Sequence, residues 1–323
     1  MMHRDGPYAG DGSYPPSYYA ASVNSTRTPV ILEGDRESDI CIVGAGYSGL
    51  STAIHLLERG HKVTLVEGAQ IGWGASGRNG GQVVNGLNAS LDAIDRKYGN
   101  ETATFVGGLL QEGAEIIYGI IDRFAIDCDL KPGNIYAAYT ERHLRSLEAK
   151  QALWRRHGMD DHEMLDRAAI RRHVGSDVYA GGMLDHSGAH LHPLNLALGE
   201  ARAAERLGAT IFERSPVTGI EAVGDRVVVR TARGRISARP LVLCGNAYLG
   251  QVVPALSPRV MPVSTQMIAT TPLDPQLAQD ILPTDKCVED TRYILDYFRL
   301  SADRRLLFGG GVVYGGTEPA DIV

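Results

Sequence analysis

A glycine-rich turn between a buried strand and a helix is the feature that most restricts the fold of this chain. Residues 39–43 form a nearly continuous apolar run, typical of a strand buried on both faces of a parallel sheet. The turn GAGYSG at residues 44–49 follows at once, and residues 50–59 have the apolar spacing of a helix that ends at Gly60. Residues 63–67 are a second strand. This β-turn-α-β unit predicts a Rossmann-type α/β fold with a dinucleotide at the turn.

The three glycines of the turn each have a steric reason. Gly44 permits the tight turn, Gly46 lets a pyrophosphate approach the backbone, and Gly49 lets the helix pack closely on the strand. Tyr47 and Ser48 lead into the helix, whose N-terminus presents free N–H groups and partial positive charge to phosphates. A structural α/β turn without a ligand is the alternative interpretation.

Glu67 ends the second predicted strand, close to the roughly 20-residue spacing at which an acid binds the adenosine ribose. The alternative is an ordinary surface glutamate at the end of a strand. Because NAD and FAD proteins share this motif, an NAD-dependent dehydrogenase remains a second hypothesis on these residues alone.

The segment 72–82 has five glycines in eleven residues. Few Cβ atoms obstruct such a backbone, so a large flat ligand such as a flavin can lie against it. A flexible surface loop is the alternative, although Trp73 and Arg78 are unusual in one. The residues of this segment that we predict to bind FAD are Gly74, Ser76, Arg78, Asn79, Gly80, Gly81 and Gln82.

The rest of the chain alternates helical and strand patterns. Residues 1–28 are rich in Tyr, Pro, Gly and Ser without periodicity, which by itself favours a flexible arm, with order beginning at Ser38. Helical spacing covers residues 101–126 and 140–175, and a stronger helix begins at Pro193. The remaining predicted strands are residues 210–213, 217–222, 226–231, 241–244, 260–270, 293–300 and 306–308.

Composition excludes several classes of protein. The net charge is −6 with acids and bases interspersed, so no nucleic-acid partner is expected. No signal peptide is recognisable and no apolar run approaches the roughly 18 residues of a membrane helix, which predicts a cytoplasmic protein without a membrane span. The four cysteines are widely spread, against a disulfide framework or a zinc site.

A histidine cluster, His186, His190 and His192, is the one candidate for a metal. No cysteine or second acid cluster accompanies it beyond Asp185, so no metal is predicted. A turn that places His192 before a helix starting at Pro193 is the simpler interpretation.

The segments VGAGYSGL, LVEG and GWGASGRNGGQV resemble the D-amino-acid-oxidase-like (DAO) superfamily of FAD enzymes, and within it most closely the gamma-glutamylputrescine oxidoreductase branch. The likeness runs from residue 17 to the end of the chain. It implies that Val217 lies against the adenine, that Gly245 lies near the flavin phosphates, and that the tyrosine-rich arm is part of the fold. Members continue past Val323, so the C-terminal segment of the family is expected to be missing.

The resemblance implies a Rossmann-type FAD-binding domain interleaved with an α+β substrate domain that contains antiparallel sheet. We expect an N-terminal arm at residues 1–36 and an FAD-binding domain at 37–84 and 190–254. The substrate domain is then 85–189 and 255–323.

The implied reaction is oxidation of a C–N bond of a small amine by hydride transfer to flavin N5, with oxygen or a carrier as electron acceptor. Gamma-glutamylputrescine is the first expectation for the substrate, and sarcosine-like N-methyl or D-amino acids are the alternative. A truncated, non-catalytic flavin-binding protein is a hypothesis of another class. No dedicated protein base is required, since only the neutral amine reacts.

Two further expectations concern the substrate and the flavin attachment. If Tyr297 and Arg299 share a face of a strand, Arg299 can pair with a substrate carboxylate, although a salt bridge at the rim is an equal alternative. The loop at residues 71–86 contains no His or Cys, and Cys41 and Cys244 lie in predicted strands. A non-covalent FAD is therefore predicted.

Overall fold

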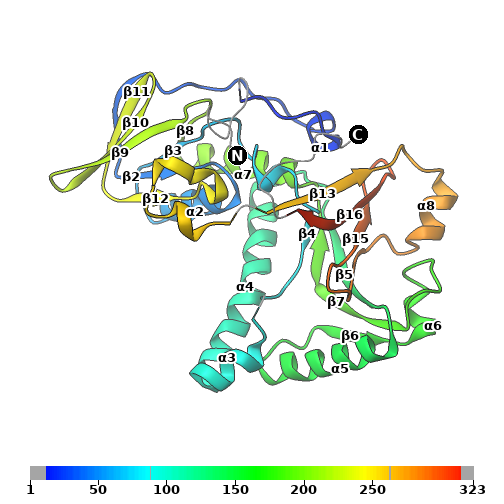
Figure 1. Ribbon diagram of the computed structural model, residues 1–323. Coiled ribbons are helices and arrows are strands. Elements are labelled where there is room, and N and C mark those ends of the chain that lie inside the picture. The colour runs from blue at the N-terminus through cyan, green and yellow to red at the C-terminus, as the bar shows by residue number, and fades with distance from the viewer. Residues whose placement is uncertain (1–11, 88, 262, 314–323) are drawn as a thin grey trace.

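The described part of the chain, residues 12–87, 89–261 and 263–313 of a computed structural model, contains three sheets. The glycine-rich turn belongs to a four-stranded parallel sheet of order β12-β2-β3-β8 (Figure 1). Its strands are β2 (Ile40–Val43), β3 (Val63–Val66), β8 (Thr210–Phe212) and β12 (Leu241–Leu243). This arrangement confirms the predicted Rossmann-type α/β fold.

Two helices pack against this sheet, α2 (Tyr47–Glu58) and α7 (Pro193–Arg206), and α4 (Asn100–Phe124) packs on α7. All four residues of β2 and of β3 are buried, as the apolar runs predict. Gly60 follows α2 with a φ of 83°, the left-handed conformation that ends a helix. The apolar core here joins Ile42, Leu50, Ile54, Leu65, Leu194 and Ala201.

A second four-stranded sheet, β1-β11-β10-β9, adjoins the first. It contains β1 (Gly34–Glu37), β9 (Val217–Val223), β10 (Arg226–Thr231) and β11 (Gly234–Ala238). The sequence predicts β9 and β10 but not β1 or β11. Every residue of β1 is exposed and β11 buries only Ile236 and Ala238, so neither strand has the apolar pattern on which the prediction depends.

The largest sheet has eight strands in the order β13-β16-β15-β14-β5-β7-β4, with β6 paired to β7. Only the β5–β14 pair is parallel. Its strands are β4 (Gln82–Val83), β5 (Lys131–Ala138), β6 (His162–Leu165), β7 (Gly181–His190), β13 (Ser264–Ala269), β14 (Cys287–Asp290), β15 (Tyr297–Leu300) and β16 (Leu306–Val313).

Different helices cover the two faces of this mixed sheet. On one face α5 (Glu141–Arg156) packs Leu147 and Trp154 on Tyr136, close to α3 (Leu91–Tyr98). On the other face, α6 (Arg167–Ile170) and α8 (Pro275–Ile281) pack on Ile135 and Phe298. The mixed sheet therefore has one face that contacts α5 and an opposite, apolar face.

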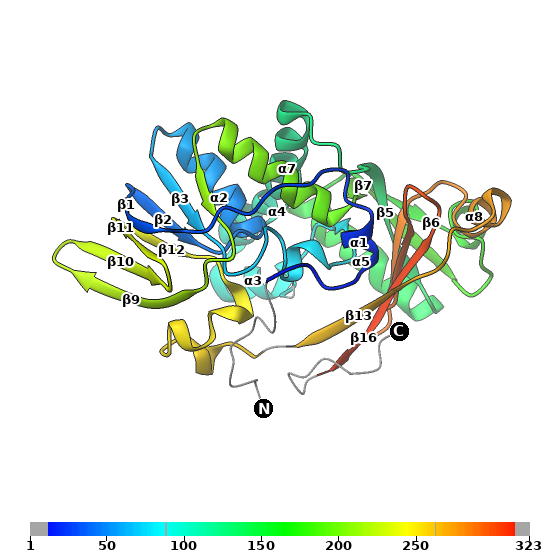
Figure 2. The same ribbon diagram turned by 90° about the horizontal axis from the view of Figure 1, so that it is seen from above.

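The predicted flexible arm is wrong for its described residues, whereas the fold implied by the family resemblance fits. Helix α1 (Tyr18–Ala21) buries Tyr19, and the Tyr14 hydroxyl donates to Ile71 O at 2.6 Å. Figure 2 shows α1 beside α7, between the parallel sheet and the mixed sheet. Residues 1–11 lie outside the described residues.

Several elements in and around the mixed sheet begin or end at other residues than the sequence predicts. The predicted helix at 140–175 is interrupted by β6, and the strand expected at 293–300 begins only at Tyr297. Strands β5, β7 and β14 are not predicted, since they mix polar residues such as Asn134 and Asp185 into buried positions. The division into two discontinuous domains stays a prediction.

Among the described residues, no helix combines the length and the apolar character needed to cross a bilayer.

Candidate functional site

The glycine turn leaves no room for side chains at its three glycines. A Cβ on Gly44, whose φ is 106°, would stand 2.6 Å from Cys244 O, and one on Gly49 would stand 2.0 Å from Gly44 O. A Cβ on Gly46 would stand 2.7 Å from the Ser76 Oγ. The backbone of the turn therefore packs directly against the residue that follows β12 and against Ser76 of the 72–82 loop.

The N-terminus of α2 is open to an anion. Its N-cap is Gly46, which has no side chain of its own to accept from the first N–H groups of the helix. The Tyr47 N–H donates to Ser76 Oγ at 3.0 Å, which joins the helix start to the glycine loop. The N–H groups of the first turn other than that of Tyr47, the helix dipole and the absence of Cβ atoms at the glycines together fit the pyrophosphate of a dinucleotide.

Glu67 is buried at the end of β3 and has an internal function that sequence reasoning missed. Its Oε2 accepts from Ala45 N–H at 2.7 Å and its Oε1 accepts from Ala69 N–H at 2.9 Å. Burial raises the pKa of this carboxyl, and the two backbone donors oppose that shift. Each carboxylate oxygen retains a second lone pair, so the predicted ribose contact stays a prediction.

The 72–82 loop is held in shape by its own polar side chains, against the alternative of a flexible loop. Asn79 Oδ1 accepts from Gly81 N–H at 2.8 Å, and Asn79 Nδ2 donates to the Ala75 and Ser76 carbonyls. Arg78 donates to the Tyr248 hydroxyl at 3.1 Å. Direct contacts of Ser76, Arg78 and Asn79 with FAD stay predictions.

Aromatic side chains pack within and beside the same loop. The Arg78 guanidinium lies 4.8 Å from the centroid of the Trp73 ring, and Tyr248 meets Trp73 edge-on at 5.7 Å. A Cβ on Gly74 would stand 2.9 Å from the Tyr248 ring. Tyr248 lies in a short helix 174 residues after Gly74, and no local pattern in the sequence indicates this contact.

Arg299 is buried behind the glycine loop, with 3% of its surface exposed. Its Nε donates to Gly80 O at 2.6 Å, and its other nitrogens donate to the Tyr19 hydroxyl at 3.1 Å and Leu300 O at 3.3 Å. A substrate carboxylate would compete with these internal acceptors. The predicted pairing of Arg299 with substrate stays a prediction, but the structure gives this residue a positioning role that the sequence does not reveal.

Tyr297 lies on the same face of β15 as Arg299, two residues earlier. Its ring is seated between two glycines: a Cβ on Gly80 would stand 2.9 Å from Tyr297 Cε2, and one on Gly309 would stand 2.2 Å from Tyr297 Cζ. Gly309 is its cross-strand partner on β16. The ring therefore joins the glycine loop to the mixed sheet.

The other predicted cofactor residues lie at the edges of this region. Gln82 Nε2 donates to Val288 O at 3.3 Å and to Asn134 Oδ1 at 3.4 Å, which brings the end of the loop onto the mixed sheet. The Gly245 nitrogen lies 3.1 Å from the Cβ position of Gly44. Val217 is half-buried at the start of β9, and its adenine contact stays a prediction.

Three cysteines and the histidines His190 and His192 are buried within the protein. Cys41, Cys128 and Cys287 are buried, and burial raises the pKa of each to about 12, which disfavours the nucleophilic thiolate and supports the prediction of a non-covalent flavin. His192 caps α7 by accepting from Asn195 N–H at 3.1 Å, as the turn interpretation predicts. Separately, His190 Nε2 lies 2.8 Å from Asp285 O.

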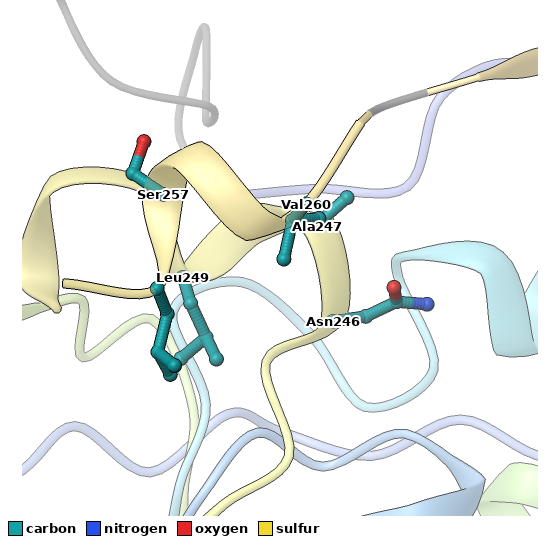
Figure 3. Close-up of a pocket in the computed structure, with 7 residues that line it drawn as sticks. Asn246, Ala247, Leu249, Ser257 and Val260 are labelled. Carbon is teal, nitrogen blue, oxygen red and sulfur yellow. The ribbon is translucent and has the colours of Figure 1, made fainter. Parts of the chain in front are cut away.

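Two small cavities lie outside this region. Figure 3 shows the first, lined by Asn246, Ala247, Leu249, Ser257 and Val260, with a volume of about 30 Å³, enough for a water molecule. The second, about 220 Å³, is on the apolar face of the mixed sheet beside Phe298 and Phe308. Neither contains Tyr297 or residues of the glycine turn.

Comparison with known proteins gives consistent results. Residues 39–322 match the family FAD dependent oxidoreductase (DAO). The chain is 48% identical over 307 residues to gamma-glutamylputrescine oxidoreductase of Escherichia coli, covering 95% of this chain and 72% of that protein. It is 38% identical to probable oxidoreductase OrdL of Haemophilus influenzae, over 91% of this chain and 69% of the relative.

The solved structure of glycine oxidase from Geobacillus kaustophilus has the same fold, with a TM-score of 0.67 at 23% identity, over 88% of this chain and 73% of that one. The match to the family covers most of the chain, including the glycine turn, the glycine loop and the face with Tyr297 and Arg299. It favours FAD over the NAD hypothesis. This chain is an enzyme of the DAO family of FAD-dependent oxidoreductases.

Proposed function

We propose that this enzyme oxidises the C–N bond of a small amine and that gamma-glutamylputrescine is its substrate. The observation that carries the proposal is the 48% identity to a gamma-glutamylputrescine oxidoreductase over 95% of the chain. The geometry supports it: the glycine-rich N-terminus of α2 fits a pyrophosphate, and the glycine loop meets a sheet face with polar side chains. FAD, when bound, supplies the acceptor for the hydride.

The chain's own residues bind the cofactor and position the groups that border the substrate. The N–H groups at the start of α2 bind the phosphates, and Glu67 binds the ribose while it holds Ala45 and Ala69 in place. Arg299 and Asn79 fix the Gly80–Gly81 peptide from its carbonyl and N–H sides. Tyr297 borders the substrate beside this peptide.

Anaerobic mixing of the FAD-loaded enzyme with candidate amines tests the proposal. Gamma-glutamylputrescine should bleach the flavin absorbance fastest, ahead of putrescine, sarcosine and D-alanine. Faster bleaching by sarcosine or D-alanine would replace the substrate assignment. Absence of bleaching by every amine would favour a flavin-binding protein without this activity. Re-oxidation of the reduced enzyme by air, compared with an added quinone, identifies the electron acceptor.

A further inference from the structure

A row of side chains extends from the glycine loop across one face of the mixed sheet. It starts at Tyr297, which lies against Gly80. Glu289 on β14 is the cross-strand partner of Tyr297, and Tyr136 on β5 is the partner of Glu289 on its other side. Lys150 of α5 completes the row, with its Nζ 4.1 Å from the centroid of the Tyr136 ring.

The two charged members of this row have no ionic partner in the described part of the chain. The Lys150 ammonium lies over the rings of Tyr136 and Trp154, at 4.1 and 4.3 Å, and no carboxylate oxygen of the described residues approaches it within 4.0 Å. The Glu289 carboxylate accepts no hydrogen bond from those residues. Both side chains are half-buried, so neither charge is freely solvated.

The electrostatic environment shows that each charge is incompletely compensated. Burial lowers the pKa of Lys150, and the charges of Glu289 and Asp185 oppose that shift. Burial raises the pKa of Glu289, and Lys150 opposes it. Asp185 accepts hydrogen bonds from Ser187 and Gly188, whereas neither Glu289 nor Lys150 has a hydrogen bond or ion pair with another described residue. A ligand that brings one group of each sign compensates both charges.

The length of the row favours a long, linear ligand over a compact one. Neighbouring strands are about 4.8 Å apart, so Tyr297 and Tyr136, two strands apart, are separated by about 10 Å. A linear amine whose reacting end lies beside Gly80 and Tyr297 has its far end near Lys150.

We propose that Lys150 and Glu289 determine substrate specificity by binding the carboxylate and the ammonium of an α-amino-acid group at the far end of the substrate. The inference depends on the proposed amine oxidation and narrows its substrate class to linear amines with a zwitterionic head. Arg299 is not needed for the carboxylate, because it already donates to Gly80, Tyr19 and Leu300.

The test compares gamma-glutamylputrescine with N-(4-aminobutanoyl)putrescine, which lacks only the carboxylate, in anaerobic stopped-flow reduction of the FAD-loaded enzyme. Lys150→Met should raise the apparent Kd for gamma-glutamylputrescine about tenfold or more, the effect of one lost charge-assisted contact. The limiting reduction rate should change less than about twofold, and the Kd for the decarboxylated amine should stay the same. Lys150→Arg should restore most of the affinity. Glu289→Gln should weaken the binding of both compounds, because both carry the ammonium group.

Arg145→Met, an exposed change on the same helix, is the matched control and should alter neither Kd. Calorimetric titration with gamma-glutamylbutylamide, which carries the head but no reacting amine, measures binding without turnover and should show the same loss in Lys150→Met. Equal losses for both amines, or unchanged binding of the butylamide, would overturn the assignment and leave amine oxidation intact. A wild-type enzyme that no amine reduces, yet that holds FAD, would instead overturn the proposed function.

Discussion

The glycine turn and the Tyr297–Lys150 row are built in opposite ways. The turn is local: Gly44, Gly46, Gly49 and Glu67 lie within 24 residues, and short backbone contacts satisfy their polar groups. The row draws on three strands and a helix spread from Tyr136 to Tyr297, and its two opposite charges make no hydrogen bond or close ion pair within the described residues. On our proposals, the cofactor common to the family binds to a local motif, whereas the substrate binds to side chains that long-range strand pairing brings together.

The two regions also treat buried carboxyl groups differently. In α7, behind the turn, Glu200 is 3% exposed and its Oε2 has no hydrogen-bond partner in the described residues. Burial raises the pKa of Glu200 to about 8, so this carboxyl is mostly protonated at neutral pH. Glu289 in the row has Lys150 within electrostatic reach. Burial without a nearby opposite charge favours the neutral acid at Glu200, whereas at Glu289 the Lys150 ammonium partly offsets the rise in pKa that burial causes.

The largest expected effect is on the turn. Gly46→Val should abolish FAD binding, because the new Cβ would stand 2.7 Å from Ser76 Oγ and its methyl groups would fill the pyrophosphate space. The flavin-to-protein absorbance ratio of the purified variant measures this. Gly113→Val, on α4 with nothing within 4 Å of its Cβ position, is the control and should keep its flavin. Stoichiometric flavin in Gly46→Val would remove the turn from the cofactor site.

The next effect concerns the buried acid of α7. The folded-state pKa of Glu200 is raised, so its contribution to stability is complete below the unfolded value of about 4.5 and is lost as pH rises through about 8. Between pH 5 and pH 8 the wild type should therefore lose about 3–5 kcal/mol of unfolding free energy relative to Glu200→Gln. Urea unfolding at several pH values measures the difference. The exposed change Glu112→Gln should show none, and parallel pH curves for wild type and Glu200→Gln would contradict the expectation.

A smaller effect separates the two functions of Glu67. Glu67→Ala should weaken FAD binding by about 1–3 kcal/mol, since it removes a charged acceptor from the site. It should also lower Tm, because the Ala45 and Ala69 N–H groups lose their partner. Fluorescence titration of the apoprotein with FAD gives the Kd, and Glu37→Ala, at an exposed strand end, is the control. A lowered Tm with unchanged affinity would leave Glu67 as a purely structural residue.

The last prediction concerns the substrate and leaves the protein unchanged. Only the neutral amine has the lone pair that the reaction needs, so kcat/KM for flavin reduction should rise up to tenfold per pH unit below the pKa of the substrate amine, around 10. Stopped-flow reduction from pH 7 to pH 10 measures the profile. A profile that stays level over this interval would argue against reaction of the free amine.

The glycine turn could be predicted from the sequence because its contacts join residues that are close together in the chain. The order strand, GAGYSG, helix and acid determines the backbone of the turn almost alone. The row could not be predicted, since β14 is only four residues long and α5 looks like an ordinary charged helix in which Lys150 is one basic residue of several. The proximity of Tyr297 and Arg299 follows from strand alternation, but their contacts with Gly80 and Tyr19 depend on tertiary packing.

The hydrogen bonds of Arg299 have a consequence for the kinetics of assembly. They join β15 to Gly80 across 219 residues of chain and to Tyr19 across 280. Contacts that close such long loops form late in folding, because their entropic cost is repaid only when most of the chain is in place. The glycine turn can form early, yet the loop beside it acquires its final shape among the last events. In a refolding time course, helical circular dichroism should therefore recover before flavin binding, and FAD uptake should mark the end of the folding reaction.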